Sequence, residues 1–112
     1  MVFRDYRGKS RNGHWVYGSL MFNDGFCTIF TNKNLSTDVI RNTVGQWSGI
    51  YDINNTKVYE GDIIKDGKDL YLVEFNAPYF CAKEIDKNIS YLLSLKENME
   101  VVGNIYDGWM LN

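Results

Sequence analysis

Few side chains in this sequence are of the types that perform acid–base or metal chemistry. The chain has one histidine, His14, and two cysteines, Cys27 and Cys81. A single histidine excludes a histidine pair or a multi-histidine metal site within one chain. The cysteines lack zinc-site spacing and lie in apolar stretches, which favours buried free thiols. The predicted strand pairing places Cys27 opposite Leu20 and Met21, so a Cys27–His14 nucleophile pair is not expected.

Four carboxylates are the remaining candidates for catalysis: Asp52, Glu60, Asp62 and Glu74. A carboxylate pair can act as acid and base, or can hold a metal that cleaves a phosphodiester. The sequence has no D-x-D or E-x-K nuclease pattern and no nucleophile elbow. We therefore interpret Asp52 and Asp62 as turn-capping residues and Glu60 and Glu74 as solvated. The prediction is that the protein is not an enzyme and uses no metal or other cofactor.

Aromatic residues give the stronger functional signal. The chain has three tryptophans and eight tyrosines, and these residue types are enriched in contact surfaces because each has a large apolar body and a polar group. We interpret the surplus as core and subunit interface, with a platform that stacks a base, a nucleotide or a protein side chain as the alternative. The residues predicted to bind such a ligand are Trp15, Tyr17, Arg41, Gln46, Trp47, Tyr51, Lys57 and Tyr59.

Length and charge narrow the class of protein. A chain of 112 residues with 45% hydrophobic residues can bury a core without disulfides. Its net charge of −2 weighs against a duplex-DNA binder, which usually presents a basic face. The one dense basic run, Arg4, Arg7, Lys9 and Arg11, is predicted to be a solvated N-terminal segment, with a nucleic-acid arm as the alternative. No signal peptide or membrane-length apolar run is visible, so we expect a cytoplasmic protein with no membrane contact.

Turn residues separate short apolar runs, which is the pattern of an antiparallel β protein. The clearest hairpin joins strands over 14–22 and 26–31 through Asn23-Asp24-Gly25. Residues 36–41 are read as a short strand or one helical turn, and only 91–98 have helical character. Gly61 is predicted to bend the chain and Gly103 to mark a bulge. Further strands are predicted over 43–50, 57–59, 62–65, 70–75, 79–85, 89–95 and 99–106.

Three stretches of the sequence carry a family resemblance. They are FRDYRGKSRNGHWVYGSL at 3–20, TVGQWSGIYDINNTKVYEGDII at 43–64 and VVGNIY at 101–106. In order and spacing they resemble the YopX family of bacteriophage and prophage proteins. The chain departs from the family pattern at Ser48, at Asn54-Asn55 and in the tail 107–112, and its middle, 75–98, matches weakly. The resemblance implies a phage-encoded protein with an SH3-like barrel core, made in the bacterial cytoplasm, with no established catalytic residues.

The predicted architecture is a mainly β single domain over 1–112, a small curled antiparallel sheet with N-terminal strands in 1–42 and an SH3-like barrel core at about 43–106. The predicted function is non-enzymatic binding that occupies or sequesters a host target, such as a protein of the host's defence. The alternatives are an oligomeric sponge for a nucleotide-type small molecule and, less favoured, a nucleic-acid-binding SH3-like module. We also expect a homo-oligomer, because surplus aromatic residues and open strand edges need covering.

Overall fold

The computed structural model describes residues 2–32, 34–87, 89–94 and 98–108, with side chains described from residue 5 onward. Eleven strands and one three-residue 3-10 helix make up the regular structure of these residues. The chain divides into two compact units, 1–47 and 48–112. The boundary falls inside strand β5 (Gly45–Tyr51). The predicted mainly β fold with a curled antiparallel sheet is confirmed, whereas the predicted extent of the barrel core stays a prediction.

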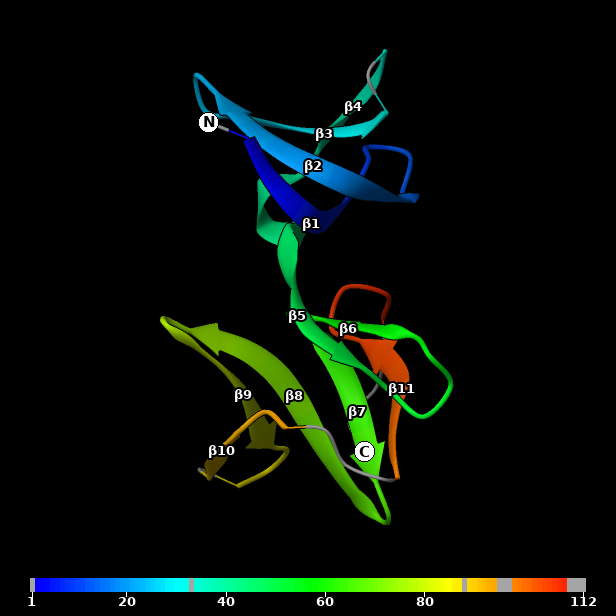
Figure 1. Cartoon of the computed structure of the whole chain (residues 1–112), viewed down its shortest axis with the longest axis vertical. Helices are drawn as coiled ribbons and strands as arrows, with labels where there is room; N and C mark the ends of the chain where they lie inside the picture. The colour runs from blue at the N-terminus through cyan, green and yellow to red at the C-terminus, as the bar shows by residue number, and fades with distance from the viewer. Residues whose placement is uncertain (1, 33, 88, 95–97, 109–112) are drawn as a thin grey trace. The chain divides into compact units, whose positions relative to one another are not determined.

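In the first unit, four antiparallel strands pair in chain order and curl into half a barrel (Figure 1). The curl returns the end of β4 to the end of β1. Ser10 and Val39 form an isolated bridge there, and the N–H of Ile40 donates to the carbonyl of Lys9 at 2.8 Å. The elements of this unit are β1 (Val2–Lys9), β2 (Trp15–Asn23), β3 (Phe26–Asn32), β4 (Leu35–Val39) and the 3-10 helix η1 (Arg41–Thr43).

The hairpin between β2 and β3 confirms the predicted turn. Asn23 pairs with Phe26 and leaves Asp24 and Gly25 as a two-residue loop. Both loop residues have positive φ, 47° and 85°, as a type I′ turn requires. Because β2 runs on to Asn23, Cys27 lies opposite Phe22 rather than opposite Leu20 and Met21 as predicted. The predicted register was therefore wrong by one to two residues.

Alternation along these strands builds a small apolar core in the first unit. Leu20 pairs with Ile29, and Cys27 pairs with Val39, so each pair shares one face of the sheet. All four side chains are buried, and Tyr6, Val16 and Val44 pack against them. Cys27 is a buried free thiol, as predicted. Of the two alternatives for residues 36–41, the short strand is confirmed, since β4 ends at Val39; the helical turn η1 begins only at Arg41.

The second unit contains a five-stranded antiparallel sheet in the order β10-β9-β8-β7-β11. The short strand β6 (Lys57–Tyr59) follows β5 in the other sheet. A register shift between Val101 and Gly103 confirms the predicted bulge. The strands of the five-stranded sheet are β7 (Asp62–Asp66), β8 (Asp69–Asn76), β9 (Tyr79–Glu84), β10 (Ser90–Leu92) and β11 (Met99–Asn104).

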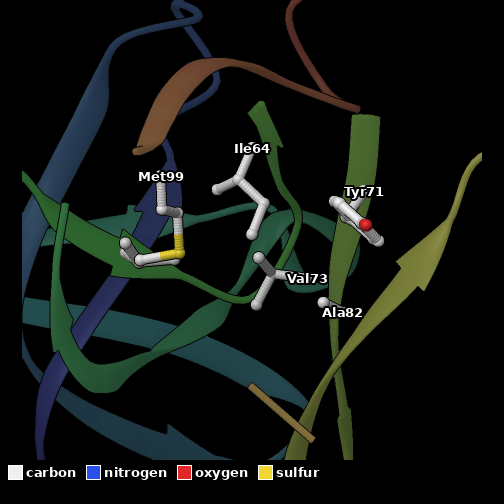
Figure 2. Close-up of a cluster of buried hydrophobic side chains, with 6 residues drawn as sticks. Ile64, Tyr71, Val73, Ala82 and Met99 are labelled. Carbon is white, nitrogen blue, oxygen red and sulfur yellow. The ribbon is translucent and has the colours of Figure 1, made fainter. Parts of the chain in front are cut away.

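One face of this sheet carries the core of the second unit (Figure 2). Cross-strand pairing aligns Ile64 with Tyr71 and Val73 with Ala82, and Met99 joins them from β11. Val58 on β6 completes the buried cluster. Each fully buried valine or isoleucine stabilises the fold by about 1.5–3 kcal/mol relative to an exposed one, so this cluster is the main apolar contribution to the unit.

Two predictions for the second unit were wrong. Cys81 is half-buried rather than buried, because it alternates with the core residue Ala82 along β9. The helical character assigned to 91–98 is contradicted where the structure describes it, since Tyr91 and Leu92 belong to β10. Residues 95–97 of that stretch lie outside the described residues.

Buried carboxylates hold the turns of the second unit, as predicted for Asp52 and Asp62. Oδ1 of Asp52 accepts from the N–H groups of Asn54 and Thr56 at 2.8 and 2.9 Å, and Oδ2 accepts from that of Val101 at 2.9 Å. Oδ2 of Asp62 accepts from the N–H of Tyr59 at 2.7 Å. Asp52 therefore ties the turn after β5 to β11, and Asp62 holds the chain between β6 and β7.

Replacing Gly61 with alanine should unfold the second unit more readily. Gly61 has φ +93°, and an added Cβ would lie 2.7 Å from the ring of Tyr106. Backbone strain and overpacking together predict a loss of about 2–4 kcal/mol in the free energy of unfolding, measured by urea denaturation. Gly67→Ala is the matched control, because Gly67 has φ +65° with no atom near its Cβ position. Equal losses in the two variants would contradict the contact with Tyr106.

Asp52→Asn should lower stability at neutral pH and flatten its pH dependence. Burial raises the pKa of Asp52, but hydrogen bonds from the N–H groups of Val101, Thr56 and Asn54 together lower it by more than burial raises it. The pKa therefore lies below the ordinary value of 3.8. A lowered folded-state pKa contributes stability above the unfolded-state pKa, and this contribution disappears as pH falls through the folded-state value. We expect a loss of about 1–2 kcal/mol near pH 7 that shrinks toward acid pH in urea titrations. A loss that is independent of pH would contradict this role. Asp69→Asn, at the exposed first residue of β8, serves as the control.

Candidate functional site

A cleft of about 550 Å³ lies in the first unit, where β3 begins and β4 ends. Its floor consists of two residues of the apolar core, Cys27 and Val39. Its rim is exposed and carries both charges and apolar groups. The rim residues are Arg11, Gly25, Phe26, Asp38, Ile40 and Arg41.

Closure of the curled sheet assembles this rim from three parts of the chain. The bridge between Ser10 and Val39 holds the β1–β2 turn, and with it Arg11, beside the end of β4. The type I′ turn at Asp24-Gly25 starts β3 so that Phe26 reaches the same cleft. Arg41 follows two residues after Val39, at the start of η1. The site therefore depends on a pairing between the first and the fourth strands.

The ring of Phe22 positions the side chain of Arg41, and hydrogen bonds of Thr43 position its backbone. Its guanidinium carbon lies 5.9 Å from the centre of the Phe22 ring, within the range of a cation–π contact. The short helix that carries it is held by Thr43, whose hydroxyl donates to the carbonyl of Ile40 at 2.6 Å and accepts from the N–H of Lys9 at 2.8 Å. The arginine is thus attached to β1 through its own helix.

The charged side chains at the rim form few hydrogen bonds or ion pairs with the described residues. Oδ1 of Asp38 accepts from the hydroxyl of Thr28, its cross-strand partner, at 3.0 Å. Within the part of the chain that the structure describes, neither Arg11 nor Arg41 forms an ion pair. Two exposed guanidinium groups and one carboxylate therefore surround an apolar floor, an arrangement suited to a ligand with an anionic group, a hydrogen-bond donor and an apolar part.

A second cationic cluster lies along β1 and β2. Arg7 is only 5% exposed, and its guanidinium carbon is 4.5 Å from the centre of the Trp15 ring; Nζ of Lys9 is 5.6 Å from the same ring. The prediction of a solvated N-terminal segment was therefore wrong for these residues. They form a strand, and pairing of Lys9 with Trp15 places the two cations against the indole.

The structure places five of the eight predicted ligand-binding residues in the first unit. Trp15 and Tyr17 share one face of β2, where Trp15 is half-buried and Tyr17 is exposed. Gln46 and Trp47 are half-buried on β5, where Gln46 pairs with Tyr6. Arg41 lines the cleft.

The other three predicted residues belong to the second unit. Tyr51 is exposed at the end of β5, Lys57 is half-buried at the start of β6, and Tyr59 is buried at the end of that strand. A ligand-binding role for the eight residues stays a prediction. The rim residues Arg11, Phe26 and Asp38 were missed. The turn at Asp24-Gly25 was a usable signal for Phe26, but no local pattern brings Arg11 to β4.

Other kinds of site are limited by what the described residues contain. Among them, no group of three or more histidine, cysteine, aspartate or glutamate side chains is placed to hold a metal ion. The helical part of the described chain includes no segment with the length and apolarity required to cross a membrane.

A comparison with protein families matches residues 5–111 to the family described as YopX protein. The chain belongs to the YopX family. The match covers nearly the whole chain and confirms the resemblance seen in the three sequence stretches. The YopX family is associated with phages and prophages. Comparison with curated protein sequences finds no match.

Thr43→Val should destabilise the first unit, because it removes both hydrogen bonds of the hydroxyl while keeping the side-chain volume. We expect the free energy of unfolding to fall by about 1–3 kcal/mol in chemical denaturation, since the N–H of Lys9 loses its partner in a buried setting. Thr31→Val is the control, because among the described residues that exposed hydroxyl makes only a 3.5 Å contact with the Leu35 carbonyl. Indistinguishable stabilities would show that Thr43 does not anchor η1.

Proposed function

We propose that this YopX-family protein is a non-enzymatic binding protein of a phage or prophage, acting in the bacterial cytoplasm by occupying a host protein. One observation carries the proposal. An aromatic surface continues the core of the second unit at one end of its sheet. It is formed by the exposed Phe75 and Tyr91 with the half-buried Phe80, hereafter the aromatic surface.

The aromatic surface is built by strand pairing. Phe75 pairs with Phe80 across β8 and β9, and their ring centres are 4.7 Å apart. Tyr91, on the end strand β10, lies edge-on to the core residue Tyr71 at 6.1 Å. Phe80 packs against the core, whereas Phe75 is 37% and Tyr91 45% exposed. An apolar face that begins in the core thus reaches solvent.

Such a surface supports recognition of a protein. Exposed aromatic side chains at the margin of a packed core supply the anchors that dominate protein interfaces. The end strand β10 has three exposed residues, and end strands can pair with an extended segment of another chain. We propose that a host protein binds this surface. The alternative is that a second copy of this chain covers it in a homo-oligomer.

Two variants of the aromatic surface and one matched control test the proposal. We expect tagged wild-type chain expressed in a host bacterium to recover a host protein, and the purified pair to bind directly. Phe75→Ser and Tyr91→Ser should weaken that binding about tenfold or more. Tyr79→Ser should not, because Tyr79 is 59% exposed but alternates with Phe80 onto the opposite face.

Light scattering on the same samples separates the two occupants. A monomeric wild type that binds its host protein through the aromatic surface supports the proposal. A stable wild-type oligomer that Phe75→Ser converts to monomer, with no loss of host-protein binding, would contradict it, as would equal binding by all four chains.

A nucleotide-type ligand is the second candidate function, because Arg41, one of the residues predicted to bind it, lines the cleft of the first unit. A nucleic-acid-binding role has less support, since the chain has a net charge of −2.

A further inference from the structure

We propose that the cleft of the first unit binds a nucleotide, with its phosphate between Arg11 and Arg41 and its base over the apolar floor. This site goes beyond the binding of a host protein and lies in a different unit from the aromatic surface. The proposal depends on the composition of the rim, the charge of the unit and the shape of the cleft.

The phosphate position follows from the two arginines. Both side chains are exposed at the rim, and within the described residues neither is paired with a carboxylate. A guanidinium group presents a planar set of donors that matches the oxygens of a phosphate. Because Arg41 is held near the ring of Phe22 and η1 is held by Thr43, that guanidinium is partly preorganised for a ligand.

The charge of the first unit favours an anion as well. Residues 1–47 contain six basic and three acidic residues, whereas residues 48–112 contain six basic and eleven acidic ones. The overall net charge of −2 therefore hides a first unit of net +3. A locally positive field raises the concentration of anionic ligands near the cleft.

The apolar part of the cleft suits an aromatic base. Phe26 at the rim is 59% exposed, and Ile40 is also exposed, while Val39 and Cys27 form the floor. A flat base can cover these groups by stacking and apolar contact, which every base offers through its π-face. The cleft volume of about 550 Å³ lies in the range of small-molecule sites, about 300–1,000 Å³.

Asp38 distinguishes a nucleotide from a simple anion. Its carboxylate lines the same cleft as the two arginines, and among the described residues its one hydrogen bond, from Thr28, uses Oδ1. A carboxylate repels a bare anion but accepts hydrogen bonds from an exocyclic amino group or a ribose hydroxyl. A nucleotide combines these donors with a phosphate and a ring, so it satisfies the whole cleft, whereas inorganic phosphate satisfies only the arginines.

Calorimetric titration of the full chain with four probes tests the ligand class. The probes are adenosine monophosphate, cyclic di-adenosine monophosphate, adenosine and inorganic phosphate. We expect at least one of the two nucleotides to bind about tenfold or more tighter than both adenosine and inorganic phosphate. Equal binding of phosphate and nucleotides, or no binding by either nucleotide at millimolar concentration, would overturn the proposal.

Variants then locate the site. Arg11→Gln with Arg41→Gln should weaken nucleotide binding about tenfold or more, whereas Lys65→Gln with Lys68→Gln should leave it unchanged. Both double variants remove two exposed positive charges, but the lysines are in the second unit. Equal weakening in the two double variants would show that only net charge matters, and would overturn the proposal.

Two single variants test the remaining contacts. Asp38→Asn should reduce the preference for nucleotide over inorganic phosphate, and Phe26→Ala should weaken nucleotide binding but not phosphate binding. All cleft substitutions are at exposed positions, and thermal unfolding verifies that each variant is folded. The arginine double variant should still bind the host protein recovered through the aromatic surface, so failure of one proposal is distinguishable from failure of the other. Unchanged selectivity in both single variants would contradict the assigned contacts.

Discussion

The return of the fourth strand to the first is the constraint on which the first unit depends. Pairing of Ser10 with Val39 and the hydrogen bond from Ile40 to Lys9 close a sheet that would otherwise have an open edge there. Thr43 strengthens the closure by bonding both Lys9 and Ile40. Because Val39 is also a core residue, the same contact that closes the sheet supplies the floor of the cleft and sets Arg11 beside η1. The residues that close the sheet therefore also form the candidate site.

In the second unit, the sheet that carries the core also carries the proposed binding surface. Its core lies on one face of an antiparallel sheet. Asp52 holds the turn after β5 by accepting from the N–H groups of Asn54 and Thr56, and joins that turn to β11 by accepting from the N–H of Val101. The core face extends past the buried cluster to Phe75 and Tyr91. Apolar groups left exposed beside a packed core are typical of a contact surface, and this extension of the core face is the feature from which we propose that the unit binds a host protein.

Local patterns in the sequence were sufficient for much of the fold. Asp24-Gly25 identified its turn because only a few residue types adopt positive φ at low cost, and Asp52 and Asp62 were recognised as caps from their turn context. The burial of Arg7 was not foreseen, since a basic run has no local sign that one of its members will pack on Trp15. Arg41 was selected as a ligand residue and does line the cleft, but Arg11 and Asp38 reach it only through closure of the sheet, a long-range pairing that no short pattern encodes.

We propose above that closure of the sheet creates a nucleotide site in the first unit. Amide chemical-shift mapping of the isotopically labelled full chain during titration with a purine nucleotide tests it most directly. We expect saturable shifts concentrated at the residues that line the cleft rim, which are Arg11, Gly25, Phe26, Asp38, Ile40 and Arg41. Shifts centred on the second unit, or no saturable shifts at any amide, would contradict it.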